Sequence, residues 1–189
     1  MTLQWNRKDE SHSNQRVDNS LTIYHGSGHI IRQPRLDKGI GRKDFGPGFY
    51  TTEIRKQAED FIKSLFYKSD NRILGLSNMY INKYELTLDK SLNIKIFPEP
   101  DEEWLEFLVL DDRLKVKFNY DIIIGPTADD QARTTLNLFK KQVENKGLDK
   151  DLVKYIAKKL KTEKLSEQYC IKTEKALKRL NFKGVDLIE

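Results

Sequence analysis

Three short segments of the 189-residue sequence combine residue types that could hold a ligand against the backbone. The first has histidine, glycine and serine in a row after a short apolar run. The second is a glycine-rich turn that leads into aromatic and threonine residues, and the third places acidic and amide side chains before an apolar run. They are residues 24–27, 44–52 and 166–171. Glycine lets a ligand approach backbone N–H and C=O groups, while imidazole and amide side chains can hold hydroxyl groups.

Three other chemistries fit the sequence poorly. Asp44-Phe45-Gly46 has the sequence of the kinase magnesium motif, but neither a GxGxxG loop nor a His-Arg-Asp segment accompanies it. His25 and His29 are separated by a glycine-containing turn, so they do not form a helical ligand pair and we expect no metal. Adjacent carboxylates are expected at helix starts or on the surface rather than in a glycosidase site: Glu102-Glu103, Asp111-Asp112 and Asp129-Asp130.

In their order and spacing the three segments resemble the motifs of the ADP-ribosyltransferase superfamily, in the branch shared by diphtheria toxin and the poly(ADP-ribose) polymerases. That branch reads His-Gly-[Ser/Thr], then Gly-x-Gly-[Ile/Phe]-Tyr, and then a strand that opens with Glu or a substitute followed by Tyr. The eleven residues from Tyr50 to Phe61 match the spacing of its two nicotinamide-stacking rings. The resemblance covers residues 21–180. Within this superfamily the chain is similar to a bacterial domain family of unknown function, some of whose relatives are toxin-like.

The resemblance implies that NAD+ is the co-substrate and that no metal takes part. His25 is then expected to bind a ribose hydroxyl, the backbone of Gly26 the nicotinamide carboxamide, and Ser27 the same amide. Tyr50 and Phe61 are expected to sandwich the nicotinamide ring. Rigid positioning of this kind matters because cleavage of the nicotinamide–ribose bond passes through an oxocarbenium-like state.

Gln168 occupies the position of the family's catalytic glutamate, where the side chain holds the ribose 2′-hydroxyl. A neutral amide lacks the negative charge that the glutamate supplies, so Gln168→Glu is expected to retain or raise NAD+ cleavage. Glu167 is adjacent but faces the opposite side of a strand, and takes the role only if the register is shifted by one. Ser166 stands where the arginine-specific branch carries Glu or Gln, so arginine is not the favoured acceptor.

The expected function is transfer of one ADP-ribose unit from NAD+ to a macromolecule, either protein or nucleic acid, with His25, Tyr50 and Gln168 as the catalytic residues. An inactive module that binds NAD+ or nucleic acid and an NAD+ glycohydrolase are the alternatives. The resemblance also implies a cytoplasmic toxin or defence effector, with a neutralising antitoxin protein as a partner.

Composition bounds these expectations. The chain has a mass of 22.2 kDa, 38% hydrophobic residues and a mean hydropathy of −0.69. It contains no apolar run near the roughly 20 residues of a membrane-spanning helix. A single cysteine, Cys170, excludes an internal disulfide and a CxxC-type zinc site. We expect a poorly ordered, polar leader over residues 1–20, which has no apolar core of a secretory signal, and one domain over residues 21–189.

Positive charge is concentrated in the last third of the sequence. Residues 133–189 hold 15 Lys and Arg against 8 Asp and Glu, a net charge of +7, which leaves −2 for the rest of a chain of +5. Such a segment is either a solvated lysine-rich helix surface or a surface that attracts a polyanion.

Hydrophobic periodicity predicts an α+β fold. The resemblance implies that its mixed or antiparallel β-sheets are split around an NAD cleft and flanked by helices. Strands are predicted at 21–25, 49–52, 79–88, 120–126, 168–173 and 185–188. Helices are predicted at 55–66, 101–110, from 127 onward with a Thr127–Asp130 capping box, at 148–160 and at 174–180. Residues 34–48 are predicted to be a loop because they hold four glycines and two prolines.

Overall fold

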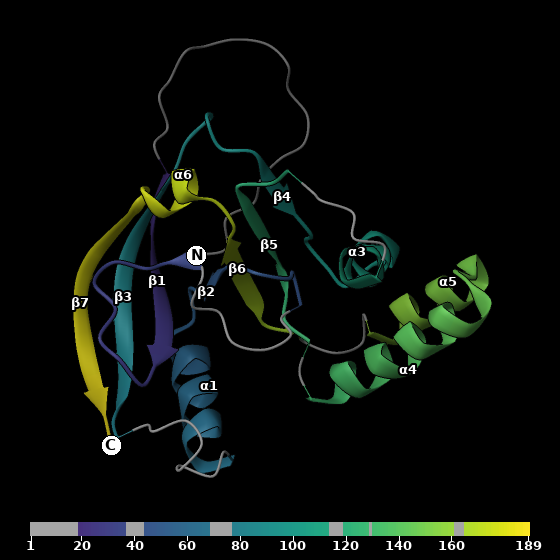
Figure 1. Cartoon of the computed structure of the whole chain (residues 1–189), viewed down its shortest axis with the longest axis horizontal. Coiled ribbons are helices and arrows are strands. Elements are labelled where there is room, and N and C mark those ends of the chain that lie inside the picture. The colour runs from purple at the N-terminus through teal and green to yellow at the C-terminus, as the bar shows by residue number, and fades with distance from the viewer. Residues whose placement is uncertain (1–18, 37–43, 69–76, 114–118, 129, 161–164) are drawn as a thin grey trace.

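The computed structural model describes residues 19–36, 44–68, 77–113, 119–128, 130–160 and 165–189. It is an α+β fold with two β-sheets and flanking helices (Figure 1). Nearly all of the predicted leader, residues 1–18, lies outside the described residues. The first strand begins at Asn19, two residues before the predicted domain start.

The first sheet is antiparallel and has the order β1-β3-β7. β1 (Asn19–Ser27) runs along the whole of β3 (Met79–Leu88), and β3 pairs on its other side with β7 (Leu180–Ile188). Alternating buried residues explain this placement, because Leu21 and Ile23 face the same core as Tyr84 and Leu86.

The second sheet is mixed and has the order β2-β6-β5-β4. β2 (Phe49–Thr51) and β5 (Ile122–Pro126) lie on either side of β6 (Glu167–Ile171) and are antiparallel to it, while β4 (Ile94–Ile96) pairs with β5 in parallel. All five residues of β5 are buried, as the continuous apolar run predicts.

Helices cover the outer surfaces of both sheets. α1 (Arg55–Lys68) packs on the lower end of the first sheet in Figure 1, and α3 (Glu102–Arg113), α4 (Asp130–Lys146) and α5 (Lys150–Leu160) lie beside the second. The short α6 (Glu174–Leu177) connects β6 to β7. No described helix is long and apolar enough to cross a membrane.

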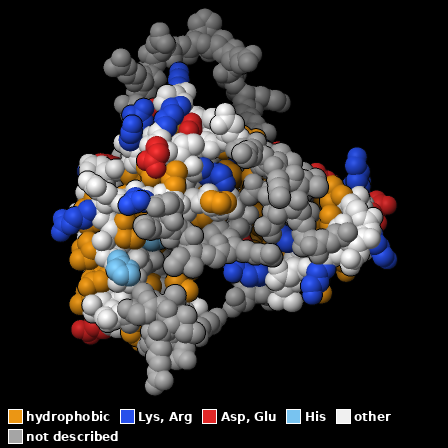
Figure 2. Space-filling view, viewed as in Figure 1, with side chains coloured by type: hydrophobic (Ala, Val, Ile, Leu, Met, Phe, Trp, Pro, Cys, Tyr) orange, Lys and Arg blue, Asp and Glu red, His pale blue; other side chains and the backbone are white. Residues whose placement is uncertain are grey.

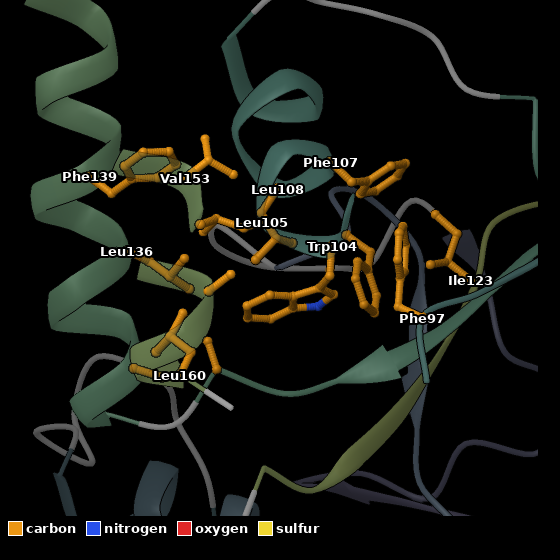
Figure 3. Packing of buried hydrophobic residues seen from close by; sticks show 14 of the residues in the cluster. Phe97, Trp104, Leu105, Phe107, Leu108, Ile123, Leu136, Phe139, Val153 and Leu160 are labelled. Atoms are coloured by element: carbon orange, nitrogen blue, oxygen red, sulfur yellow. The ribbon is translucent and has the colours of Figure 1, made fainter. Parts of the chain in front are cut away.

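The largest apolar cluster lies between the second sheet and helices α3, α4 and α5. Trp104 is fully buried at its centre, between residues of β5 and the facing helices (Figure 3). Asp101 caps α3 by accepting a hydrogen bond from Trp104 N at 2.9 Å, so the acidic pair Glu102-Glu103 lies in the first helical turn, as expected. A second cluster fills the space between the two sheets.

Three points of the predicted local structure need correction. β4 was not predicted, because a three-residue strand shows no periodicity, and β7 starts five residues earlier than predicted, because pairing with β3 extends it. Thr127 does not begin a helix: its N–H donates to Ser166 O at 2.6 Å, and its hydroxyl accepts from Gln57 Nε2 at 3.2 Å. Thr127 therefore ties β5 to the residue before β6 and to α1, and α4 begins only at Asp130.

Candidate functional site

His25 lies near the end of β1, where this strand meets β2. Tyr24 N donates to Thr52 O at 2.7 Å and Thr52 N donates to Tyr24 O at 3.0 Å, forming an isolated bridge between the two sheets. Nδ1 of His25 lies 2.6 Å from the carbonyl oxygen of Tyr50. Because a carbonyl can only accept, Nδ1 carries a proton in this contact, and the hydrogen bond fixes the orientation of the ring. His25 is the residue predicted to contact a ribose hydroxyl.

Gly26 turns its backbone groups away from β3. In an antiparallel pair, successive residues alternate between facing the partner strand and facing away. Tyr24 uses both of its backbone groups on Thr52, so Gly26, two residues later, has the same orientation and points its N–H and C=O toward the side of β2. One donor and one acceptor side by side match the two hydrogen-bonding ends of a carboxamide.

The missing side chain of Gly26 also has a packing reason that the sequence did not reveal. A Cβ atom there would lie 2.2 Å from the backbone oxygen of Ala58 and 3.1 Å from Cβ of Ile62, both in α1. The glycine therefore lets α1 approach β1. The predicted role of Ser27 is less distinct, because its hydroxyl already accepts a hydrogen bond from His29 N at 3.2 Å within its own turn.

Tyr50 is partly buried, and its hydroxyl is held within the preceding turn. It accepts from Phe45 N at 3.0 Å and donates to Gly46 O at 2.7 Å, and Gly46 has φ of 71°, in the left-handed region. Burial raises the pKa of the Tyr50 hydroxyl far above its usual value, so it stays protonated. What Tyr50 can offer a ligand is therefore its ring and not acid–base chemistry.

Phe61 lies in α1 and is 43% exposed. It follows Gln57 by one helical turn, so the two side chains share one stripe of the helix. Gln57 accepts from the Thr52 hydroxyl at 2.6 Å and donates to Thr127 Oγ1 at 3.2 Å. The stripe that carries Phe61 therefore begins beside Thr52, directly after the end of β2.

Gln168 faces the same side of the second sheet as Tyr50. Cys170 lies directly opposite Tyr50, and Gln168 is two residues away from it on β6. The amide is 8% exposed, and its Nε2 donates to Asp44 Oδ2 at 2.9 Å and to Pro126 O at 3.2 Å. Among the described residues its Oε1 accepts no hydrogen bond, so it remains available as an acceptor.

Glu167 faces the opposite side, as strand alternation predicts. Glu167 is exposed at the start of β6. On the same side of the sheet, the hydroxyl of Tyr169 donates a hydrogen bond to Glu53. Partial desolvation, together with the charge of Glu53, raises the pKa of Glu167. The observed register thus places Gln168, and not Glu167, beside Tyr50.

Sequence reasoning missed four polar residues that hold this site together. They are Asp44, Thr52, Gln57 and Thr127. Their contacts join segments far apart in the chain, and the only signal for any of them was the threonine and aspartate content of the glycine-rich segment. Within the part of the chain that the structure describes, no three His, Cys, Asp or Glu side chains gather to hold a metal ion.

A comparison with known protein families places this arrangement in one of them. The model of a family described as a protein of unknown function (DUF3990) matches residues 21–182, from β1 into β7. The chain belongs to the DUF3990 family. No curated protein and no solved structure shows a significant match. The matched range of this DUF3990 chain contains all the predicted site residues, from His25 to Gln168.

The ring pair gives a first testable prediction. In this DUF3990 chain, Tyr50→Ala and Phe61→Ala are each expected to weaken NAD+ binding by about 1–3 kcal/mol, through lost stacking and lost apolar contact. Isothermal titration calorimetry measures both. Tyr50→Phe is the matched control: it loses the two hydrogen bonds of the turn but keeps the ring, so it should lose stability and retain affinity. Unchanged affinity in folded Tyr50→Ala would contradict the ring pair.

The fixed imidazole gives a second prediction. His25→Ala is expected to slow nicotinamide release about tenfold, or about 1.4 kcal/mol, the value of roughly one hydrogen bond. Because the side chain orients a hydroxyl and transfers no proton, the loss should be similar at all pH values. A pH–rate profile of the wild type and the variant checks this. Disappearance of an acid limb in the variant would instead assign His25 to proton transfer.

Proposed function

We propose that this DUF3990 domain is a mono-ADP-ribosyltransferase that cleaves NAD+ and transfers one ADP-ribose unit to a macromolecule. The observation that carries the proposal is that the three segments of the resemblance are neighbours in the fold, because the bridge between Tyr24 and Thr52 joins β1 to β2 and β2 pairs with β6. The backbone of Gly26, the ring of Tyr50 and the amide of Gln168 come from β1, β2 and β6, in the family order of motifs. The two sheets and their flanking helices form an α+β fold (Figure 1), which is also the fold class that the resemblance implies.

The residues present suit NAD+. Gly26 supplies one N–H and one C=O for the carboxamide, Tyr50 and Phe61 supply rings for the flat nicotinamide, and the side chains of His25 and Gln168 supply contacts for ribose hydroxyls. Both side chains are held in place by hydrogen bonds to other residues, so they need no reorganisation during the reaction.

In the proposed reaction the bond between the nicotinamide nitrogen and ribose C1′ breaks, and its electron pair leaves with neutral nicotinamide. A lone pair of the acceptor atom forms the new bond to C1′, and the proton of the acceptor goes to solvent. The protein contributes by orienting the ribose and nicotinamide and by placing acceptor oxygens beside the sugar as positive charge develops there.

The deciding experiment supplies labelled NAD+ to the purified protein, first alone and then with cell lysate. Nicotinamide release together with label on a macromolecule is the expected result, and separate nuclease and protease digestion identifies the acceptor class. Release without label would indicate NAD+ glycohydrolase activity. NAD+ binding without nicotinamide release would indicate an inactive module. Gln168 favours this alternative over the glycohydrolase, because its neutral amide lacks the charge of the family's catalytic glutamate.

The same resemblance leads us to propose a biological setting. It is a cytoplasmic toxin or defence effector, which a cell would need to restrain with a neutralising protein partner. Co-purification from a source cell that tolerates the active protein tests for that partner.

The basic segment gives a prediction about the acceptor. Exposed lysines lie along α4 and α5, among them Lys141, Lys154, Lys158 and Lys159. Figure 2 shows Lys and Arg side chains scattered over the visible face, rather than gathered in one continuous patch. If these lysines recruit nucleic acid, binding should weaken steeply between low and physiological salt. Filter binding with RNA and DNA measures this, and no affinity at low salt would favour a protein acceptor.

A further inference from the structure

The amide of Gln168 is oriented by two acceptors. Its Nε2 has two hydrogens, and the structure provides an acceptor for each, at Asp44 Oδ2 and Pro126 O. Rotation of the amide would place Oε1 against two oxygens, which strongly disfavours that orientation. Gln168 is therefore held so that it presents an oxygen to a ligand, as a carboxylate would.

Asp44 is itself held firmly. Its Oδ2 also accepts a hydrogen bond from Ala128 N at 3.1 Å, and its Oδ1 lies 3.8 Å from the guanidinium of Arg133. The side chain is only 14% exposed, and Arg133 is anchored in turn by a 3.2 Å bond to Ala128 O. This carboxylate is thus a largely buried group with a fixed position directly behind Gln168.

We propose that Asp44 is a positioning residue that supplies, through the Gln168 amide, the negative charge that a glutamate at position 168 would supply directly. This inference rests on the proposed function. A carboxylate that accepts an amide N–H polarises the amide and increases the electron density on its oxygen. Oε1 then becomes a better acceptor for a ribose hydroxyl, and the charge of Asp44 lies one hydrogen bond away from the amide. Because Coulomb energy falls with distance, the stabilisation is weaker than that from a glutamate.

Asp44→Asn separates this role from a purely structural one. The asparagine Oδ1 can accept from both Gln168 Nε2 and Ala128 N, so the variant keeps those hydrogen bonds and removes the charge, together with its attraction to the exposed Arg133. We expect kcat for nicotinamide release to fall about tenfold or more, with KM for NAD+ and the melting temperature nearly unchanged. Asp44→Ala removes both charge and hydrogen bonds, and is expected to lower activity and melting temperature together.

Asp121→Asn is the matched control. Asp121 is also a buried aspartate: it accepts from Asn93 N at 2.8 Å and from Thr173 Oγ1 at 2.6 Å, and Lys175 lies 3.3 Å away. Hydrogen bonds hold its pKa below the usual value, in spite of the opposing effect of burial. It lies beyond the end of β5 remote from Gln168, so its replacement should reduce stability and leave kcat unchanged.

The same contacts revise the expectation for Gln168→Glu. A carboxylate at position 168 would place oxygen against Asp44 and against Pro126 O, where the amide now donates. We now expect this variant to lose activity, and Asp44→Asn in the same chain to recover part of it, because one of the two facing carboxylates is then neutral.

The outcomes are distinct. An active wild type whose Asp44→Asn variant keeps kcat within about threefold overturns the role of Asp44 and leaves the proposed function standing. A loss shared equally by Asp121→Asn, or failure of Asp44→Asn to fold, also overturns it, because the charge then serves the fold. A wild type that releases no nicotinamide overturns the proposed function, and this inference with it.

Discussion

Replacement of Gln168 by alanine is expected to slow nicotinamide release by about 2–4 kcal/mol of activation free energy, which is roughly 30- to 1,000-fold. The variant loses the acceptor that is proposed to hold the ribose 2′-hydroxyl as positive charge develops on the sugar. The affinity for NAD+ should fall less than the turnover rate, because the hydrogen bond to the 2′-hydroxyl is stronger in the transition state than in the ground state. Steady-state kinetics with calorimetric affinity separate the two effects.

The control for this prediction is the adjacent residue. The side chain of Glu167 faces the other side of β6. Its backbone carbonyl accepts a hydrogen bond from the Thr52 hydroxyl, and this contact is retained in Glu167→Ala. That variant should therefore be nearly silent in turnover. The melting temperature of Gln168→Ala must be followed as well, because the loss of its donors leaves Asp44 without one partner. An inactive Glu167→Ala beside an active Gln168→Ala would assign the site to the opposite side of the strand.

The second large effect is expected from Gly26→Ala, which should reduce the free energy of unfolding by about 3 kcal/mol or more. The new methyl group would lie 2.2 Å from the backbone oxygen of Ala58, and a helix backbone cannot yield as a flexible side chain does. α1 must then move away from β1, taking Phe61 with it. Urea unfolding followed by circular dichroism measures the stability, and NAD+ titration of the folded fraction measures the site.

Thr22→Ala is the control on the same strand. Its side chain is exposed on β1, so its replacement should cost less than about 1 kcal/mol, the range of intrinsic strand preference. If Gly26→Ala proved no more destabilising than Thr22→Ala, the contact between β1 and α1 would be looser than the structure shows.

The long, periodic elements could be predicted from the sequence. β3 was predicted with its exact bounds, because ten alternating residues leave little ambiguity, and α1 and α5 were predicted to within two residues at each end. The register of β6, which places Gln168 on the side of Tyr50, also follows from strand alternation. What these elements share is a signal that is local in the sequence.

Contacts between distant segments could not be predicted in this way. Asp44 and Gln168 are 124 residues apart, and Thr127 was assigned to a helix cap because its local sequence fits one, whereas its actual partners lie in α1 and before β6. The glycine at position 26 illustrates the same limit, since its closest neighbour is the backbone of a helix that begins 29 residues later. Polar pairing across the fold leaves no periodic trace in one sequence.

The strand order of the second sheet has a consequence for when the site forms. β6 lies between β2 and β5, so these two strands do not pair with one another, and each is hydrogen-bonded to β6 instead (Figure 1). During synthesis, the ring of Tyr50 and the turn that holds Asp44 must wait for a strand made more than a hundred residues later. Such non-local pairing folds slowly. The candidate site therefore cannot form in the nascent chain before β6 has been synthesised.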